Sequence, residues 1–166
     1  ARDRERVKDL ILLPTVDVVY ADVHDPAALA GLVKGSGAVI NLVGVLHDGR
    51  GDASFEQAHV ELTRKIIAAC EAEGVMRYLH MSALGADVNG PSRYQQSKGR
   101  AEALVRDSKL EWTMFRPSVI FGPDDSFLNL FAKLLALAPV MFLAKADARF
   151  QPVYIEDVAT AFLRAF

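Results

Sequence analysis

Short apolar segments and longer amphipathic segments alternate along the chain. The short apolar segments predict buried strands, because a strand that is covered on both faces has little room for polar residues. These predicted strands cover residues 16–21, 38–43, 77–82 and 111–116. The longer segments between them predict helices, so the chain has the strand–helix alternation that builds a parallel sheet with helices on both faces.

Glycine, proline and capping residues mark where several of the predicted helices begin and end. The helix over residues 25–34 starts with Asp25 as its cap and Pro26 in its first turn. A longer helix over residues 55–73 is ended by Gly74. The other predicted helices cover residues 94–108, 127–137 and 158–166, and a short extended piece covers residues 150–154.

The composition is that of an ordinary globular domain. The 166 residues suffice for one domain with a core, and 51% of them are hydrophobic and 24% charged. A net charge of −2 gives no electrostatic reason to bind nucleic acid or acidic lipid. The longest apolar stretch, residues 127–143, is interrupted by Lys133 and Pro139 and predicts an amphipathic helix rather than a membrane span. A cytoplasmic location is therefore expected.

Cysteine and histidine are too sparse for a disulfide framework or a metal centre. The single Cys70 lies in an apolar helical segment, which predicts a buried thiol in a reducing compartment. The four histidines lie in different segments without the spacing of metal ligands, so no metal is expected. They are His24, His47, His59 and His80.

Tyr94 and Lys98 are the most informative pair of side chains. Four residues apart in the helix over residues 94–108, they share one helix face. A nearby ammonium is expected to lower the pKa of a phenol from its usual value of about 10. Such a phenol suits proton transfer to or from a carbonyl or alcohol oxygen during hydride transfer. The spacing alone is common on surface helices, so the surrounding residues decide its meaning.

Small and polar residues stand at or just past the end of each predicted strand. Parallel strands bring these ends to one edge of the sheet, where such sheets bind their ligands. The residues are Asp22 and Val23, then Leu42, Val43 and Gly44, then Met81, Ser82 and Ala83, and finally Pro117, Ser118 and Val119. Because Tyr94 and Lys98 begin the helix after the third strand, we expect a single site.

With these strand-end residues the chain resembles the short-chain dehydrogenase/reductase superfamily over nearly all of its length. The resemblance implies that Asp22 holds the adenine amino group, that Tyr94 is the acid/base and that Lys98 holds the nicotinamide ribose. It also implies that the turn at Val43 and Gly44 lets the cofactor pass close to the backbone. The implied cofactor contacts are Asp22, Val23, Leu42, Val43, Gly44, Met81, Tyr94, Lys98, Pro117, Ser118 and Val119.

Finer details resemble one atypical branch of that superfamily, related to the Rossmann-type accessory subunit of respiratory complex I and its bacterial homologues. The segments that carry this likeness are residues 21–25, 41–44, 80–86, 115–122 and 151–154. The implied fold is a doubly wound parallel α/β sheet of Rossmann type. Residues 1–166 would form a partial NAD(P)-binding domain that lacks the first two strands and the C-terminal substrate region.

The glycine-rich phosphate loop of the superfamily is absent from the sequence. By resemblance the chain starts just after the second strand of the family, which puts Arg2, Arg4 and Arg6 where basic residues clamp the 2′-phosphate of NADP. The alternative is that these arginines form the solvated start of a helix. The implied cofactor is NADP or NAD, with NADP slightly favoured.

The missing strands also affect the expected sheet. The superfamily order is 3-2-1-4-5-6, so the predicted strand at residues 16–21 should be separated from that at 38–43 by two absent strands. This should leave a gap in the core unless the protein is longer or the fragment rearranges. The ends of the chain also look cut, because it begins at Ala1 without a methionine and stops at Phe166 inside an apolar helical pattern.

A third catalytic residue beside Tyr94 and Lys98 has two interpretations in the sequence. Ser82 either reaches the substrate oxygen or only finishes its strand, and Ala83 stands where active members often carry Ser or Thr. Without that hydroxyl, turnover would be weak. Arg116 either contacts substrate or pairs with Asp157 or Glu156.

Two functions follow from the resemblance. The first is an NAD(P)-dependent oxidoreductase or epimerase with an unknown small-molecule substrate, in which Tyr94 moves the proton, Lys98 orients the ribose and Ser82 assists. The second is a non-catalytic bacterial protein that holds NADPH and supports assembly of a respiratory or quinone-linked membrane complex, attached peripherally at the inner membrane. Neither function has a nucleic-acid partner.

Overall fold

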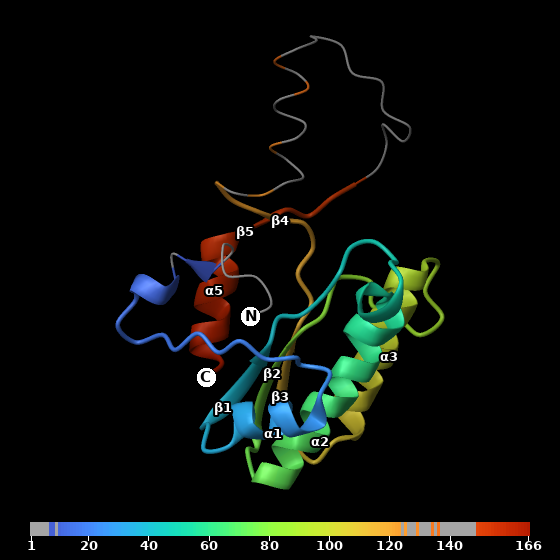
Figure 1. The fold of residues 1–166 in the computed structure, drawn as a ribbon. Coiled ribbons are helices and arrows are strands. Elements are labelled where there is room, and N and C mark those ends of the chain that lie inside the picture. The colour runs from blue at the N-terminus through green and yellow to red at the C-terminus, as the bar shows by residue number, and fades with distance from the viewer. Residues whose placement is uncertain are drawn as a thin grey trace.

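The computed structural model describes residues 7–8, 10–123, 125, 129, 134, 136 and 149–166. Three parallel strands form its central sheet. They are β1 (Ala38–Asn41), β2 (Arg77–Met81) and β3 (Glu111–Phe115), in the order β1-β2-β3. Ile40 lies opposite Leu79, and Leu79 opposite Thr113. Because both pairings are parallel, all three strands end at the same edge of the sheet (Figure 1). These strands were predicted, each to within two residues of its end.

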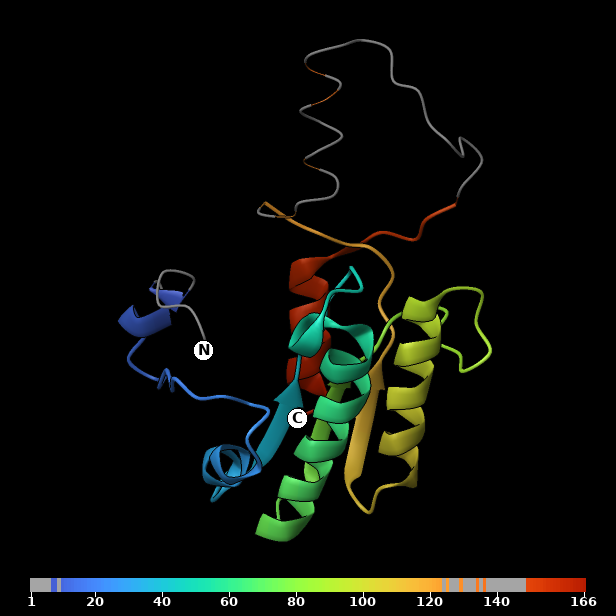
Figure 2. The same ribbon diagram turned by 45° about the vertical axis from the view of Figure 1, so that its right-hand side comes forward.

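Helices cover both faces of the sheet, as the doubly wound prediction requires. The helices α1 (Pro26–Val33), α2 (Leu62–Glu73) and α3 (Arg93–Asp107) lie on one face, and α5 (Ile155–Arg164) lies on the other (Figure 2). Successive residues of a strand point to opposite faces. On β2, Tyr78 therefore belongs to the larger core under α1–α3, and Leu79 belongs to the smaller core under α5.

The larger core contains most of the buried apolar side chains. Cys70 is fully buried within it, as predicted, and burial raises the pKa of its thiol to about 11. In the smaller core, the rings of Phe115 and Phe162 stack with their centroids 3.9 Å apart. The core residues shared among α1, α2, β2 and α3 are Leu29, Val33, Leu62, Ile66, Ile67, Cys70, Tyr78 and Val105.

The predicted cap of α1 and the predicted end of α2 are present, and Ser92 adds a cap that was not predicted. The Asp25 carboxylate accepts a hydrogen bond of 3.0 Å from the Ala27 amide at the start of α1, and Ser92 caps α3 by accepting from the Gln95 amide at 3.2 Å. Gly74 ends α2 with a φ of 73°, a left-handed conformation that glycine adopts without strain. These local signals explain why the helix bounds could be predicted closely.

The helix predicted over residues 55–73 is not uniform. Its first part is a π-helical turn, η4 (Glu56–Glu61), which leads into α2 and follows the short 3-10 turn η3 (Gly51–Ala53). Three successive residues of η4, Ala58 to Val60, are all buried. An ordinary helix seldom buries three residues in a row, because each lies about 100° further around its axis. The wider turn was not visible in the apolar pattern of the sequence.

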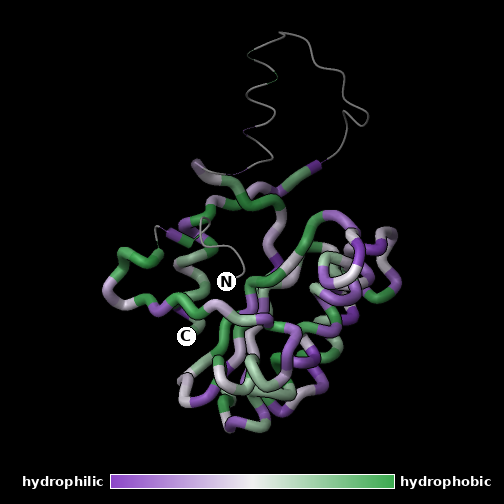
Figure 3. The backbone as a smooth tube through the Cα atoms, in the orientation of Figure 1, coloured by the Kyte–Doolittle hydropathy of each residue, from purple (hydrophilic) through white to green (hydrophobic). Residues whose placement is uncertain are grey.

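The strand predicted over residues 16–21 is wrong. This segment follows the 3-10 turn η2 (Leu10–Leu12) as irregular chain that carries several hydrophobic residues (Figure 3). Val19 is 52% exposed and Tyr20 is 42% exposed. A strand needs a neighbouring backbone with which to share hydrogen bonds. Within the described residues, 16–21 pair with neither edge of the three-stranded sheet, as expected if the strands that would separate them from β1 are missing.

A second, two-stranded sheet lies beyond β3. In it β4 (Ile120–Phe121) pairs in parallel with β5 (Val153–Tyr154), which falls within the extended piece predicted at residues 150–154. The final helix α5 begins three residues earlier than predicted. The helix predicted over residues 127–137 lies largely outside the described residues. In the part of the chain that the structure describes, no helix is long and apolar enough to cross a lipid bilayer.

Helix α3 packs so closely on the loop before it that residue 99 must be glycine. A Cβ atom at Gly99 would overlap the backbone carbonyl carbon of Asp87 and the backbone nitrogen of Val88. We predict that Gly99→Ala lowers the free energy of unfolding by about 2 kcal/mol or more, because backbone must move to make room.

Gly31 in α1 is the matched control, since a Cβ there would meet nothing within 4 Å. Gly31→Ala should be neutral or stabilise by up to about 1 kcal/mol. Urea unfolding of both variants measures the difference. Equal stability of Gly99→Ala and Gly31→Ala would show that α3 does not rest on the 87–88 backbone.

Candidate functional site

The segments that follow the three strands stay together beyond the sheet. The Ser82 amide donates to the Phe115 carbonyl at 2.8 Å, and the Leu84 amide donates to the Pro117 carbonyl at 2.8 Å. After β1, the Val43 amide donates to the Asn41 side chain at 3.1 Å. The residues predicted to follow these three strands therefore lie at one edge, whereas Asp22 and Val23 follow a segment that forms no strand.

Lys98 brings a buried positive charge to this edge. Its side chain is only 4% exposed, and its ammonium donates to the Met81 carbonyl at 3.0 Å. A Cβ atom added to Gly44 would lie 3.3 Å from the Lys98 Nζ. Burial lowers the pKa of Lys98 to about 8, against the opposing effect of the Glu102 carboxylate. The backbone at Gly44 thus runs directly beside a desolvated ammonium.

Tyr94 lies half-buried one helical turn before Lys98. Its ring meets the rings of Phe55 and His59 edge-on, with centroids 5.7 and 5.5 Å apart. We predicted that Lys98 would lower the pKa of the phenol, but burial raises it instead. Desolvation disfavours the ionised phenol, so Tyr94 is a protonated donor at neutral pH rather than a base.

His59 was set aside in the sequence because no metal-ligand spacing surrounds it, yet it lies inside the site. Its Nε2 accepts a hydrogen bond of 3.1 Å from the Val45 amide, and its Nδ1 lies 2.8 Å from the Ser97 hydroxyl. Burial and then the charge of Lys98 lower the pKa of His59 to about 4, so the ring is neutral. Only its place between Ala58 and Val60 in a predicted helix hinted at a buried role.

Ser82 faces the interior rather than the open edge. It is buried at 3% exposure, and its hydroxyl has no hydrogen-bond partner among the described residues. Burial of Glu102 opposes its ionisation, but hydrogen bonds from Arg116 and the charges of Arg116 and Arg106 outweigh it and lower the pKa of Glu102. This favours the interpretation in which Ser82 finishes its strand.

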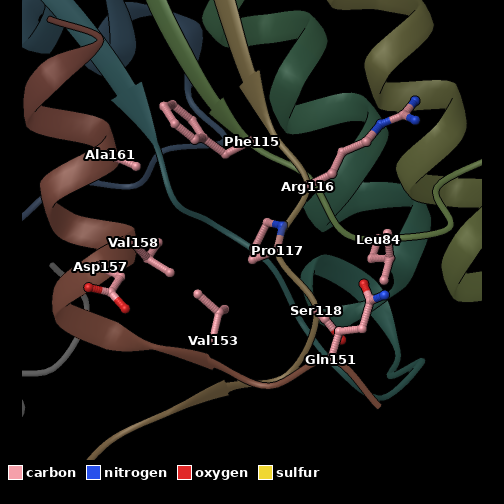
Figure 4. Close-up of a pocket in the computed structure, with 10 residues that line it drawn as sticks. All are labelled: Leu84, Phe115, Arg116, Pro117, Ser118, Gln151, Val153, Asp157, Val158 and Ala161. Carbon is pink, nitrogen blue, oxygen red and sulfur yellow. The ribbon is translucent and has the colours of Figure 1, made fainter. Parts of the chain in front are cut away.

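Arg116 pairs with Glu102, so the pairing with Asp157 or Glu156, one of its two predicted alternatives, is wrong. Its Nε donates to Glu102 Oε1 at 2.7 Å, its Nη2 donates to Oε2, and Arg106 Nη2 donates to Oε2 at 2.6 Å. Side chains alternate along β3 and its extension, so Phe115 points towards α5 and Arg116 towards α3. Figure 4 shows the guanidinium directed away from α5.

The loop after β3 forms one wall of a pocket of about 360 Å³ against α5 (Figure 4). Pro117 and Ser118, both predicted cofactor contacts, line it opposite Asp157 and Val158. The neighbouring Val119 holds the second sheet in place, because its carbonyl accepts from the Val153 amide at 3.0 Å. The other lining residues are Leu84, Phe115, Arg116, Gln151, Val153 and Ala161.

The remaining predicted cofactor contacts lie in two places, at the end of β1 and in the turn before α1. Leu42 and Val43 are exposed at the end of β1. Asp22 accepts a 2.9 Å hydrogen bond from the His24 amide and so forms a turn before α1, and Val23 packs against the larger core. His24 Nε2 lies 4.0 Å from Asp52 in the loop after β1. Arg2 and Arg4 lie outside the described residues.

Comparisons with known proteins agree with this picture. A family model described as NAD(P)H-binding matches residues 1–126. The chain is 35% identical over 148 residues to subunit 9 of the NADH dehydrogenase (ubiquinone) 1 alpha subcomplex, mitochondrial, from Arabidopsis thaliana, covering 87% of this chain and 36% of the relative. It is 32% identical over 145 residues to a ceramide reductase from Caulobacter vibrioides, covering 87% and 45%. These matches confirm the resemblance inferred from the strand ends.

Solved structures show the fold. A dTDP-glucose 4,6-dehydratase mutant from Streptomyces venezuelae with NAD bound superposes with a TM-score of 0.81 at 18% identity, covering 99% of this chain and 59% of that one. The Rossmann-like fold is therefore established. The chain spans less than half the length of the two curated relatives.

The edge fits a nicotinamide dinucleotide chemically. Gly44 leaves the backbone uncovered beside the Lys98 ammonium, where any larger residue would place a Cβ 3.3 Å from Nζ and 3.6 Å from His59 Nε2. An open backbone beside a fixed cation is the kind of surface that lets a polar, anionic ligand approach closely.

Glu102 holds two arginines from a fully buried position, since its side chain is 0% exposed. We predict that Glu102→Gln lowers the free energy of unfolding by about 2–4 kcal/mol, because it leaves Arg116 and Arg106 without their carboxylate.

Glu56, which pairs with Arg100 at 2.7 Å, is the control because 52% of its side chain is exposed. Glu56→Gln should cost less than about 1 kcal/mol. Denaturant unfolding of both variants is the measurement. A Glu102→Gln protein as stable as Glu56→Gln would contradict the central role of this carboxylate.

Proposed function

The chain belongs to the NAD(P)H-binding family, and from that premise we propose that it holds the nicotinamide half of the cofactor against Lys98 and Gly44. In this proposal Lys98 orients the ribose, and Tyr94 presents its hydroxyl to the oxygen of any substrate beside the nicotinamide. Residues 1–166 would form one partial dinucleotide-binding domain. The remaining proposed contacts are Asp22, Val23, Leu42, Val43, Met81, Pro117, Ser118 and Val119.

The observation that carries the proposal is the buried ammonium of Lys98. Its pKa of about 8 means that holding the charge out of water costs on the order of 3 kcal/mol. Residues with strongly shifted pKa values cluster at functional sites, because a ligand there uses the charge whose burial destabilises the fold. Lys98 lies beside the uncovered backbone of Gly44, where a ribose hydroxyl could accept from its ammonium.

Cofactor holding is better supported than turnover. The Ser82 hydroxyl is buried away from the open edge, and Ala83 offers no hydroxyl to orient a carbonyl. We therefore place the protein first among NADPH-holding accessory or assembly factors of a respiratory membrane complex, with peripheral attachment. The relatives named as subunits of NADH dehydrogenase support this choice.

An NAD(P)-dependent oxidoreductase or epimerase is the second candidate. The protonated Tyr94 and the adjacent Lys98 favour it, as does the likeness to a ceramide reductase. When bound, the nicotinamide would supply hydride transfer, and Tyr94 would give its proton to the substrate oxygen. The substrate remains a small molecule of unassigned class.

NADP is proposed ahead of NAD. The support is the sequence alone, in which Arg2 and Arg4 stand at the start of the domain, where the resemblance implies that a 2′-phosphate would be clamped. An arginine fork can hold a phosphate in bidentate fashion, and NAD offers none at this position.

Titration of the full-length protein with NADPH and NADH tests these proposals. We predict that Lys98→Met weakens NADPH binding about 10-fold or more through loss of a charged hydrogen bond, without lowering the unfolding midpoint. The midpoint should hold because methionine removes a buried charge and keeps the apolar stem. Tyr94→Phe should bind NADPH within about threefold of the unmodified protein, because it loses only a hydroxyl on the substrate side.

Unchanged NADPH affinity in Lys98→Met would overturn the proposed site. Tighter binding of NADH than NADPH would remove the role given to Arg2 and Arg4. Turnover of a carbonyl or quinone substrate that disappears in Tyr94→Phe would move the second candidate to first place.

A further inference from the structure

His59 lies where three parts of the candidate site meet. Through Nε2 it holds the Val45 amide of the loop after β1, and through Nδ1 it contacts Ser97 on α3. Its ring stacks on Phe55 at 5.4 Å and touches Tyr94 edge-on. The side chain is 1% exposed, so each of these contacts is shielded from water.

The π-helical turn places this side chain. His59 lies within η4, and the Leu62 amide bonds to the Gln57 carbonyl five residues earlier. The extra residue in the turn lets Ala58, His59 and Val60 all face the interior. Such turns cost stability relative to a regular helix and are frequent at functional sites.

The hydrogen bonds fix the proton on the ring. Nε2 accepts from the Val45 amide, so it carries no hydrogen. The Ser97 hydroxyl donates to the Tyr94 carbonyl at 2.8 Å, so it must accept from the Nδ1–H of His59. The proton positions follow from the bond partners alone. The result is a neutral imidazole with one acceptor towards the loop and one donor towards the helix.

Burial, and then the charge of Lys98 on α3, keep the ring neutral, and Asp48 in the loop after β1 only partly offsets them. A protonated ring would have to turn away from the Val45 amide, because two donors cannot share that bond. Asp48 also pairs with Arg93 of α3 at 2.7 Å, but the bond that holds the Val45 backbone lasts only while His59 is neutral.

We propose that His59 is the positioning residue that fixes the spacing between the Gly44–Val45 backbone and the Lys98 ammonium. The inference rests on the proposed function, because that spacing is the width of the cofactor cradle. His59 acts by way of Val45 and Ser97, while Lys98 and Gly44 provide the contacts. Its bond to Val45 draws the loop towards α3, and its bond to Ser97 anchors the ring one residue before Lys98.

Two amide substitutions separate this role from simple packing. The amide of Gln reaches the position of Nε2 and can accept from the Val45 amide, whereas the amide of Asn reaches only the position of Nδ1 and can donate to Ser97. Both remove the stacked ring equally. In the full-length protein we expect His59→Gln to keep NADPH affinity within about threefold and His59→Asn to lose about 10-fold or more, which is the range of one shielded hydrogen bond.

Nitrogen-15 NMR of the unmodified protein provides a readout that needs no variant. We expect Nδ1 of His59 to carry the proton and Nε2 to be bare at neutral pH. Protonation at Nε2 would overturn the inference, whether or not either variant folds.

The outcomes distinguish the inference from the function on which it rests. Equal affinity of both variants and the unmodified protein would overturn the role of His59 and leave the proposed site standing. Equal losses in both variants, accompanied by equal falls in unfolding midpoint, would mean that the ring only packs. Failure of the unmodified protein to bind NADPH would overturn both.

Discussion

The burial of the Lys98 ammonium is the constraint on which the site depends. Helix α3 carries Tyr94, Lys98 and Glu102 at intervals of four residues, so a phenol, an ammonium and a carboxylate follow one another along one face. The middle group is held by the Met81 carbonyl at the end of β2 and lies beside Gly44 at the end of β1. One side chain thus ties the helix to the ends of two strands, and it does so at a cost to stability.

The carboxylate of Glu102 offsets part of the cost of burying the Lys98 ammonium. It faces Lys98 one turn further along the helix and also neutralises Arg116 and Arg106. Ser82 is buried on the same side of the sheet, so its hydroxyl is not presented at the open edge where a carbonyl substrate would need it. This favours the proposal that the protein holds its cofactor over the proposal that it turns over a substrate.

The sequence was sufficient wherever the physical signal is local. Strand ends, the Asp25 cap and the left-handed Gly74 depend on neighbouring residues, and the single edge follows from parallel pairing. Predictions failed where distant groups decide the outcome. The segment at residues 16–21 has strand-like composition but joins neither sheet of the described residues, and the pKa of Tyr94 is governed by desolvation rather than by its helical neighbour. The π turn and the role of His59 were missed because both depend on packing against α3.

The most direct test of the account is the dissociation constant of NADPH for Gly44→Ala in the full-length protein. The added Cβ would meet only the flexible end of Lys98 at 3.3 Å and the His59 ring at 3.6 Å, so the unfolding midpoint should change little. The added methyl group would nevertheless occupy the space between the Gly44 backbone and the Lys98 ammonium in which the cofactor is proposed to bind. The account predicts binding weakened about 10-fold or more, as expected when a close backbone approach is blocked. Unchanged affinity in a folded Gly44→Ala protein would contradict it.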